Sequence, residues 1–181
     1  MKIMIASDIH GSAYYCSKMI NAYRREKAEK LLLLGDILYH GPRNDLPKEY
    51  NPKQVIEMLN EISSELLCVR GNCDTEVDQM VLDFPIMAEY CILYLESHMI
   101  FATHGHKFNE ENPLLIKKGD ILLNGHTHIP KCTEHENYIY MNPGSISIPK
   151  AGSANGYMIV DKNEFLWKDL EGNCFNIFKF K

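Results

Sequence analysis

The amino-acid sequence predicts an α/β fold in which two sheets pack face to face and helices lie outside them. Its first third alternates short apolar runs with amphipathic stretches, the pattern of strands and helices in turn. From residue 87 onward the chain instead shows a series of short strands separated by turn residues. At 181 residues and 45% hydrophobic content it has the size and composition of one globular domain, so we expect residues 1–181 to form a single domain.

Each element of the first third has a local signal. A strand is predicted at residues 2–6, and Ser12 is the expected N-cap of the helix that follows. Buried strands are predicted at residues 30–34 and 66–69. Between them, Asn51 as cap and Pro52 at the first helical position begin a second helix. The apolar faces of the two helices comprise Cys16, Met19, Ile20 and Tyr23, and Val55, Met58, Leu59 and Ile62.

The remainder of the chain is rich in predicted strands. Residues 87–95 and 99–103 are expected to form a hairpin around residues 96–98, and further strands are predicted at 121–123, 138–141, 156–160, 164–168 and 174–180. Turn residues at 161–163 and 171–173 favour antiparallel neighbours there. Aromatic side chains of the last strands either fill the core or pair subunits, and the second option predicts a homodimer or higher homo-oligomer. These residues are Phe165, Trp167, Phe175, Phe178 and Phe180.

Charge and hydropathy exclude several classes of partner. The formal net charge of −5 argues against binding to long nucleic acids, which requires a basic face. No apolar run is long enough to span a bilayer, and the N-terminal residues lack the apolar core of a signal peptide, so we expect a cytoplasmic protein without a membrane partner. The six cysteines are scattered, as expected for free thiols in a reducing compartment.

Five of the predicted strands are followed directly by Asp, Asn or His, usually beside Gly. The carboxyl ends of strands in an open α/β sheet are where loops meet and ligands bind. Glycine next to such a side chain allows the backbone to turn sharply and approach an ion. The motifs are Asp8-Ile9-His10, Gly35-Asp36, Gly71-Asn72-Cys73-Asp74, His104-Gly105-His106 and Gly125-His126-Thr127-His128.

These motifs contain seven candidate metal ligands: Asp8, His10, Asp36, Asn72, His104, His126 and His128. In an extended segment residues i and i+2 point to the same side, so each Asp-x-His or His-x-His pair can reach one point. Carboxylate, amide oxygen and imidazole together suit borderline divalent ions such as Mn²⁺, Fe²⁺, Zn²⁺ or Co²⁺. Seven donors exceed the needs of one four-coordinate ion and suit two ions that share a carboxylate.

Each motif taken alone is compatible with an ordinary loop. Gly35-Asp36 is a turn dipeptide, and Gly71-Asn72 is typical of hairpins. The recurrence of such residues at five strand ends nevertheless favours a site over independent coincidences. Among the other histidines, His98 and His135 are expected in solvent, whereas His40 and His106 lie near the expected site with open roles.

The combined pattern resembles that of the calcineurin-like metallophosphoesterases, and the small size of the chain resembles their compact bacterial and archaeal phosphodiesterase branch. The resemblance implies a four-layer α/β/β/α sandwich of two packed mixed sheets and a centre of two divalent ions. Mn²⁺ is the expected metal, with Zn²⁺, Fe²⁺, Ni²⁺, Co²⁺ and Mg²⁺ as alternatives. By motif, Asp8, His10 and His128 hold the first ion, Asp36 bridges both ions, and Asn72, His104 and His126 complete the second.

The same resemblance implies hydrolysis of a small phosphodiester by in-line attack of a hydroxide that bridges the two ions. Two divalent ions, two carboxylates and one hydroxide leave the centre at about +1, which suits a phosphodiester monoanion better than a monoester dianion. The sequence therefore favours a diesterase, and a phosphomonoesterase or nucleotidase that uses the same site is the alternative within the hydrolases.

One residue departs from the pattern of the wider family. Cys73 stands where many members have a His that resembles a donor to a phosphate oxygen or to the leaving group, and a thiol is a weak hydrogen-bond donor. Cys73 is either a tolerated filler or a catalytic residue, and we predict an enzyme that depends on good leaving groups. Asp74 is the other catalytic candidate, with loop capping as its alternative. Arg43 and Asn44 are the expected substrate-binding residues, with a surface turn as their alternative.

A protein of another functional class is the main competitor. A eukaryotic retromer subunit shares the fold of this family and resembles a non-catalytic, protein-binding scaffold that has lost part of the ligand set. This chain keeps a candidate ligand at all seven positions, which favours the enzyme.

Overall fold

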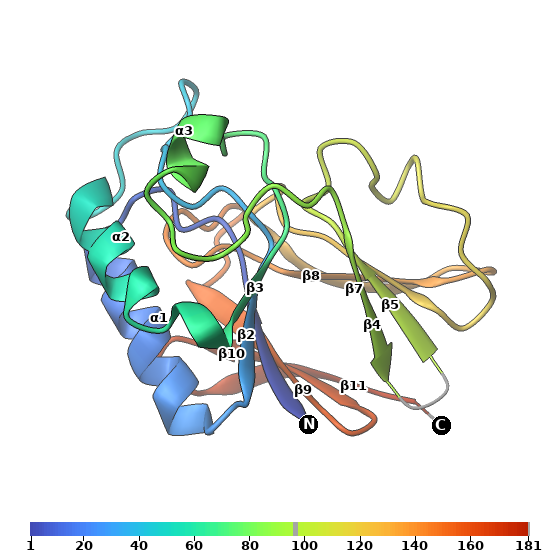
Figure 1. Ribbon diagram of the computed structural model, residues 1–181. Coiled ribbons are helices and arrows are strands. Elements are labelled where there is room, and N and C mark those ends of the chain that lie inside the picture. Colours follow the sequence, from blue (N-terminus) through green and yellow to red (C-terminus); the bar gives the residue numbers. More distant parts are fainter. Residues whose placement is uncertain (96–97, 181) are drawn as a thin grey trace.

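The computed structural model describes residues 1–95 and 98–180, and it contains two β-sheets packed against each other (Figure 1). The six-stranded sheet has the order β11-β10-β9-β1-β2-β3. Strands β1, β2 and β3 run parallel to one another, and β9, β10 and β11 each run antiparallel to their neighbours. Its strands are β1 (Lys2–Ala6), β2 (Lys30–Leu33), β3 (Leu66–Cys68), β9 (Gly156–Asp161), β10 (Glu164–Asp169) and β11 (Cys174–Lys179).

The five-stranded sheet has the order β4-β5-β6-β8-β7 and is also mixed. Strands β5, β6 and β8 are parallel, and β4 and β7 pair antiparallel at the two edges. The predicted α/β class with two packed mixed sheets is therefore confirmed. The strands are β4 (Cys91–Leu95), β5 (His98–Ala102), β6 (Ile121–Leu123), β7 (Pro130–Glu134) and β8 (Ile139–Pro143).

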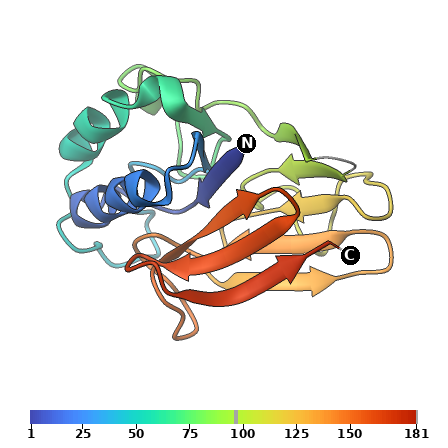
Figure 2. The ribbon, with the colours of Figure 1, turned by 90° about the horizontal axis from the view of Figure 1, so that it is seen from below.

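Two amphipathic helices, α1 (Ala13–Glu26) and α2 (Pro52–Asn60), lie on one side of the six-stranded sheet, and the five-stranded sheet lies on the other (Figure 2). Both begin as predicted, because the Ser12 hydroxyl accepts the Tyr15 N–H at 3.2 Å and Asn51 Oδ1 accepts the Gln54 N–H at 3.3 Å. The predicted apolar faces of both helices pack into the core. Within the described residues, no helix combines the length and apolarity needed to cross a bilayer.

Strand β1 shows how the two halves of the core are divided. Its alternating side chains point to opposite faces, so Met4 packs under the helices and Ile5 packs between the sheets. Phe165 and Trp167 of β10 are fully buried in the inter-sheet core, and Trp167 Nε1–H donates to the Asn142 carbonyl at 2.7 Å. Phe178 and Phe180 pack partly against the same core, whereas Phe175 is about half exposed at 48%. Four of the five late aromatic residues thus serve the core.

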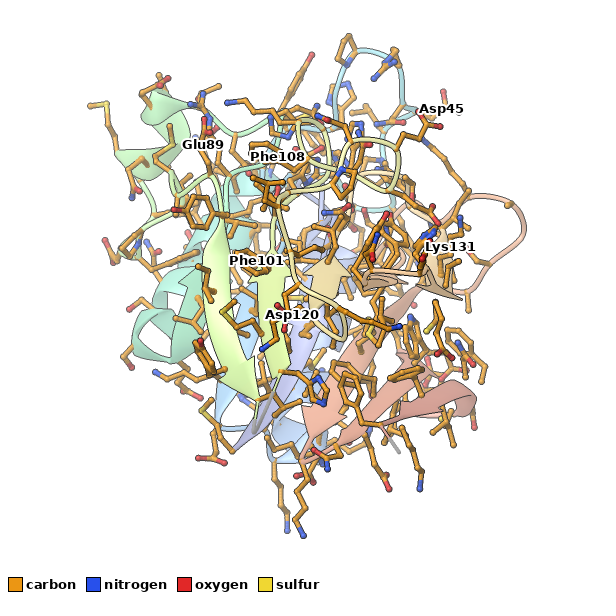
Figure 3. All side chains as sticks on the ribbon, turned by 90° about the vertical axis from the view of Figure 1, so that its right-hand side faces the viewer. Asp45, Glu89, Phe101, Phe108, Asp120 and Lys131 are labelled. Carbon is orange, nitrogen blue, oxygen red and sulfur yellow. The ribbon has the colours of Figure 1, made fainter. Side chains whose placement is uncertain are left out.

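The outer face of the five-stranded sheet lacks the helical layer expected of a four-layer α/β/β/α sandwich within the described residues. Residues 104–120 lie over it without forming a helix, and Ile116 from this segment packs against Leu122 and Tyr140. Figure 3 faces this side of the molecule, with Phe101 on β5 and Phe108 in the covering segment. On this face a loop therefore takes the place of the helical layer.

Some elements differ from the sequence prediction. Strand β7 was not predicted, because its Pro-Lys-Cys-Thr-Glu sequence lacks apolar alternation; an edge strand tolerates Pro at its start and charged residues along it. Strand β4 begins at Cys91 rather than at residue 87. The short helices Ser63–Glu65 and α3 (Glu76–Gln79) were also not predicted. Part of the turn expected at residues 96–98 lies outside the described residues.

Candidate metal centre

The loops that follow β1, β2, β3, β5 and β6 meet at the upper end of the sandwich in Figure 1. Backbone hydrogen bonds join these loops directly. The His10 N–H donates to the Asp36 carbonyl at 2.9 Å, and the Gly125 N–H donates to the His104 carbonyl at 2.8 Å. The structure thereby brings together all seven residues that the sequence singled out as candidate ligands.

Asp8, His10 and His128 form the first cluster. Asp8 Oδ1 lies 3.1 Å from His128 Nε2 and 3.5 Å from His10 Nε2, and the two imidazole Nε2 atoms are 3.3 Å apart. All three side chains are at most 3% exposed. The second carboxylate oxygen of Asp8 accepts the His126 N–H at 3.0 Å, which holds the carboxylate toward the cluster.

Asp36, His104 and His126 form the second cluster, with Asn72 beside it. His104 Nε2 lies 3.0 Å from Asn72 Oδ1, 3.2 Å from His126 Nδ1 and 3.4 Å from Asp36 Oδ2. The same Asp36 oxygen lies 3.7 Å from His10 Nε2 in the first cluster. Asp36 therefore stands between the two clusters and is within reach of both.

The donor atoms of this centre face one another in a way that fits cations. The Nδ1 atoms of His10, His104 and His128 lie 2.6–2.8 Å from the backbone carbonyls of Tyr39, Leu34 and Ile148, respectively. A carbonyl only accepts, so each Nδ1 carries a proton, and the Nε2 of each ring is the atom left to bind a metal ion or a second proton at the centre. Asp8 Oδ1 is also buried without a hydrogen-bond partner. Lone pairs that converge in a buried space repel one another unless a proton or a metal ion lies between them, so the residues present fit divalent ions.

The backbone at the centre adopts the left-handed conformation at five of the seven candidate ligands. The φ angles are +60° at Asp8, +49° at His10, +55° at Asp36, +63° at His126 and +62° at His128. Non-glycine residues rarely occupy this region, and such strain concentrates at functional sites where the surrounding structure enforces it. The strain is a second indication, independent of residue type, that these loops are shaped for a ligand.

Charges at the centre shift the pKa values of its members in opposite directions. Burial alone raises the pKa of Asp8, but the neighbouring imidazoles of His10 and His128 outweigh this effect and hold the pKa well below its usual value. Burial lowers the pKa of His104, yet Asp36 and Asp8 reverse this effect and raise it to about 9. Burial and the positive charge of His104 lower the pKa of His126 to about 4. In the metal-free protein, a proton on His104 thus supplies part of the positive charge that a metal would bring.

Asp74 is held below the centre rather than in contact with its open side. Its carboxylate accepts three backbone N–H groups, from Asp36 at 2.8 Å, Ile37 at 2.9 Å and Gly71 at 2.7 Å, and the residue is 1% exposed. Asp74 therefore ties the Gly35-Asp36 loop to the Gly71-Asn72 loop, a position that matches loop capping, the alternative to a catalytic role. A carboxylate can accept all three buried N–H groups. The sequence does not show this role, because the three donors come together only in the folded chain.

Cys73 lies at the rim of the centre. Its N–H donates to Asp36 Oδ1 at 2.8 Å, and its Sγ accepts from Asn72 Nδ2 at 3.3 Å. Burial, followed by the negative charge of Asp36, raises the pKa of the Cys73 thiol, so the side chain is neutral at physiological pH. The thiol thus does not repel an anion, and it remains a weak donor.

A pocket of about 430 Å³ opens over the centre, and we call it the centre pocket. Its rim contains the predicted Arg43 and Asn44 together with Thr127 and Lys150, which the sequence analysis did not identify. A second hollow of about 270 Å³ shares Asn72 with it and is lined on its far side by Arg70, Glu89, His106 and Lys107.

The other histidines occupy varied positions. His106 lies beside the centre, with ring centroids 5.4 Å from His104, and His40 packs between Tyr39 and Tyr50. His135 contacts Glu110. His98 is not free in solvent as expected: its ring stacks on Phe180 at 3.6 Å, and its Nδ1 lies 2.8 Å from the Gly119 carbonyl.

Comparisons with known proteins bear on the family and the fold of the chain. The family model of the calcineurin-like phosphoesterase superfamily domain matches residues 1–164. The phosphodiesterase YfcE of Escherichia coli K12 is 45% identical over 163 residues, which cover 90% of this chain and 89% of that protein. A solved structure of the E. coli phosphoesterase Yfce superposes with a TM-score of 0.96 at 41% identity over the whole of both chains. Vps29 from Chaetomium thermophilum has a TM-score of 0.64 at 18% identity, covering 99% of this chain and 97% of that one, a likeness of fold alone.

Proposed function

The chain belongs to the calcineurin-like phosphoesterase superfamily, and from that membership we propose that it is a phosphodiesterase that hydrolyses a small phosphodiester with the help of two divalent metal ions. The observation that carries the proposal is the pair of donor clusters joined by Asp36. Asp8, His10 and His128 are the proposed ligands of one ion, and Asn72, His104 and His126 those of the other. Mn²⁺ is the proposed metal.

The ions would supply a water of low pKa and neutralise the phosphoryl oxygens, the two contributions of a binuclear centre to in-line attack by hydroxide on phosphorus. The chain supplies the orientation. The carbonyls of Tyr39, Leu34 and Ile148 keep three Nε2 atoms directed inward, and the strained loops hold the carboxylates between them. The pocket above the centre has a volume of about 430 Å³ and contains the exposed Arg43 on its rim, which suits a small diester.

The proposed role of Cys73 is that of a neutral rim residue that provides little assistance to the leaving group. We therefore expect rates that rise steeply as the leaving group becomes a better one, because the thiol is a poor source of the proton that an alkoxide needs. The measurement is kcat across aryl and alkyl diesters of graded leaving-group pKa. A flat dependence with chemistry rate-limiting contradicts this role, and a Cys73→His variant is expected to flatten the dependence.

The central experiment compares Asp36→Asn with the wild type after removal of metal and re-addition of Mn²⁺. Turnover of an aryl phosphodiester and metal content per chain are measured together. We expect metal-dependent turnover in the wild type, and loss of both turnover and bound metal in the variant, because Asp36 lies between the two clusters. Asp83→Asn is the charge-matched control, because Asp83 is exposed and belongs to neither donor cluster.

The outcomes separate the competing functions. No diester turnover with any divalent metal, in a folded protein that binds metal, contradicts the phosphodiesterase; turnover of monoesters alone then favours a phosphomonoesterase. A folded protein that binds no metal and hydrolyses neither class of ester favours a protein-binding scaffold.

A further inference from the structure

We propose that the substrate carries a second anionic group, a carboxylate or a phosphate, on the ester arm that lies in the centre pocket, and that Lys150 and Arg43 bind this group. The inference rests on the proposed phosphodiesterase function and names the class of diester that the site prefers. It starts from two cationic residues that line one pocket and come from different loops, the β2–α2 loop and the β8–β9 loop.

Lys150 is anchored to the candidate centre through its backbone. Its N–H donates to the His128 carbonyl at 3.1 Å, while its own carbonyl accepts from the N–H and the hydroxyl of Ser153 at 3.0 and 2.7 Å. Two residues before it, the Ile148 carbonyl binds His128 Nδ1 at 2.8 Å. The same segment therefore orients a proposed ligand and places Lys150 among the residues that line the pocket.

Arg43 is held on the pocket wall by a tight turn. Gly41 takes a φ of +81°, and the Asn44 amide closes the turn by donating to the His40 carbonyl at 2.8 Å. A Cβ at Gly41 would lie 3.4 Å from Cys73 Sγ, so the turn packs directly against the rim of the centre. Arg43 therefore lies on the pocket wall close to this rim, and its planar guanidinium suits a carboxylate or phosphate.

The charge of the pocket exceeds what a simple diester balances. Among the described residues that line the pocket, Asp36 is the only one with a carboxylate. A centre at about +1 is neutralised by one phosphodiester monoanion, so Lys150 and Arg43 leave about two positive charges uncompensated in the pocket. The whole chain has a net charge of −5, so this local excess of positive charge is a feature of the pocket and not of the surface in general.

The test uses three diesters with the same aryl leaving group and different second arms of equal length. One arm ends in a carboxylate, one in a phosphate, and one in a neutral carboxamide of the same shape as the carboxylate. We expect kcat/KM of the wild type, with Mn²⁺, to be about tenfold higher for at least one anionic arm than for the carboxamide. In Lys150→Gln and in Arg43→Gln this ratio falls toward one, and Lys53→Gln, at an exposed lysine outside the pocket, keeps the wild-type ratio.

Three results overturn the proposal. The first is equal kcat/KM for all arms in the wild type. The second is an anionic preference that persists in both pocket variants. The third is an equal loss on all three substrates in those variants with the ratio unchanged, which would place the two cations on the scissile phosphoryl group instead. Absence of metal-dependent turnover on every arm, by contrast, refutes the phosphodiesterase function itself.

Discussion

Replacing Asp74 by Asn should destabilise the protein and weaken its metal centre, although Asp74 contacts no open part of the site. In the wild type one carboxylate oxygen accepts the N–H groups of Asp36 and Gly71, and the other accepts the N–H of Ile37. An asparagine side chain has a single acceptor oxygen. If that oxygen accepts the N–H groups of Asp36 and Gly71, the NH₂ group of the asparagine faces the Ile37 N–H. The buried Ile37 N–H then has no acceptor.

The magnitude follows from these contacts. An unpaired buried donor costs about 1–3 kcal/mol, and two charge-assisted bonds become neutral ones at a further cost of about 1–2 kcal/mol. Removal of the buried negative charge offsets part of this, since burial raises the pKa of Asp74 and the ionised form is itself unfavourable there. A net loss of about 2 kcal/mol corresponds to a fall in Tm of about 4–8 °C for a domain of this size.

The assay is thermal unfolding of the metal-stripped protein by circular dichroism, followed by Mn²⁺ titration of the folded variant. We expect weaker Mn²⁺ binding, because the displaced Ile37 and Asp36 amides move the Asp36 carboxylate between the clusters. The exposed Asp83→Asn variant controls for the change in net charge. A Tm within about 1 °C of the wild type together with unchanged Mn²⁺ affinity would refute the positioning role of Asp74.

Four further predictions concern Gly71, His104 and Trp167. In Gly71→Ala the new Cβ would lie 2.1 Å from Asp36 Oδ1, so the Asp36 carboxylate must move. We expect at least a tenfold loss of metal-dependent diesterase activity in a steady-state assay. Full activity would contradict the close packing of Gly71 against Asp36. His104 has a pKa raised to about 9 and must lose a proton to bind metal. The Mn²⁺ affinity measured by calorimetry should therefore increase from pH 6.5 to about 9. An affinity that does not change with pH would exclude His104 as a ligand. Over the same range the metal-free protein should lose stability, since a raised histidine pKa stabilises the fold below the ordinary value and that contribution disappears as pH passes through about 9. Trp167→Phe removes the donor to the Asn142 carbonyl in the inter-sheet core. The free energy of unfolding, measured by urea titration, should fall by about 1–3 kcal/mol. An unchanged midpoint would show that this hydrogen bond does not stabilise the fold.

Local sequence patterns were sufficient for the fold class and for the identity of the seven candidate ligands. Helix caps and apolar periodicity act within a few residues, so Ser12 and Asn51 could be assigned without tertiary information. The candidate ligands could be named because each follows a buried strand, and parallel strands bring their carboxyl ends to the same edge of a sheet. Strand β7 escaped prediction because an edge strand need not bury alternate side chains.

The tertiary structure decided how these residues are used. Backbone carbonyls are chemically alike along the chain, so only the fold could show that those of Tyr39, Leu34 and Ile148 direct three imidazoles inward. The left-handed backbone at Asp8 and Asp36 likewise depends on neighbouring loops that force it. What the sequence determined by itself was the chemistry available at the strand ends, since residue type and local spacing are sequence properties. Which atoms face one another depends on contacts between segments more than a hundred residues apart, as between Asp8 and His126, and only folding creates those contacts.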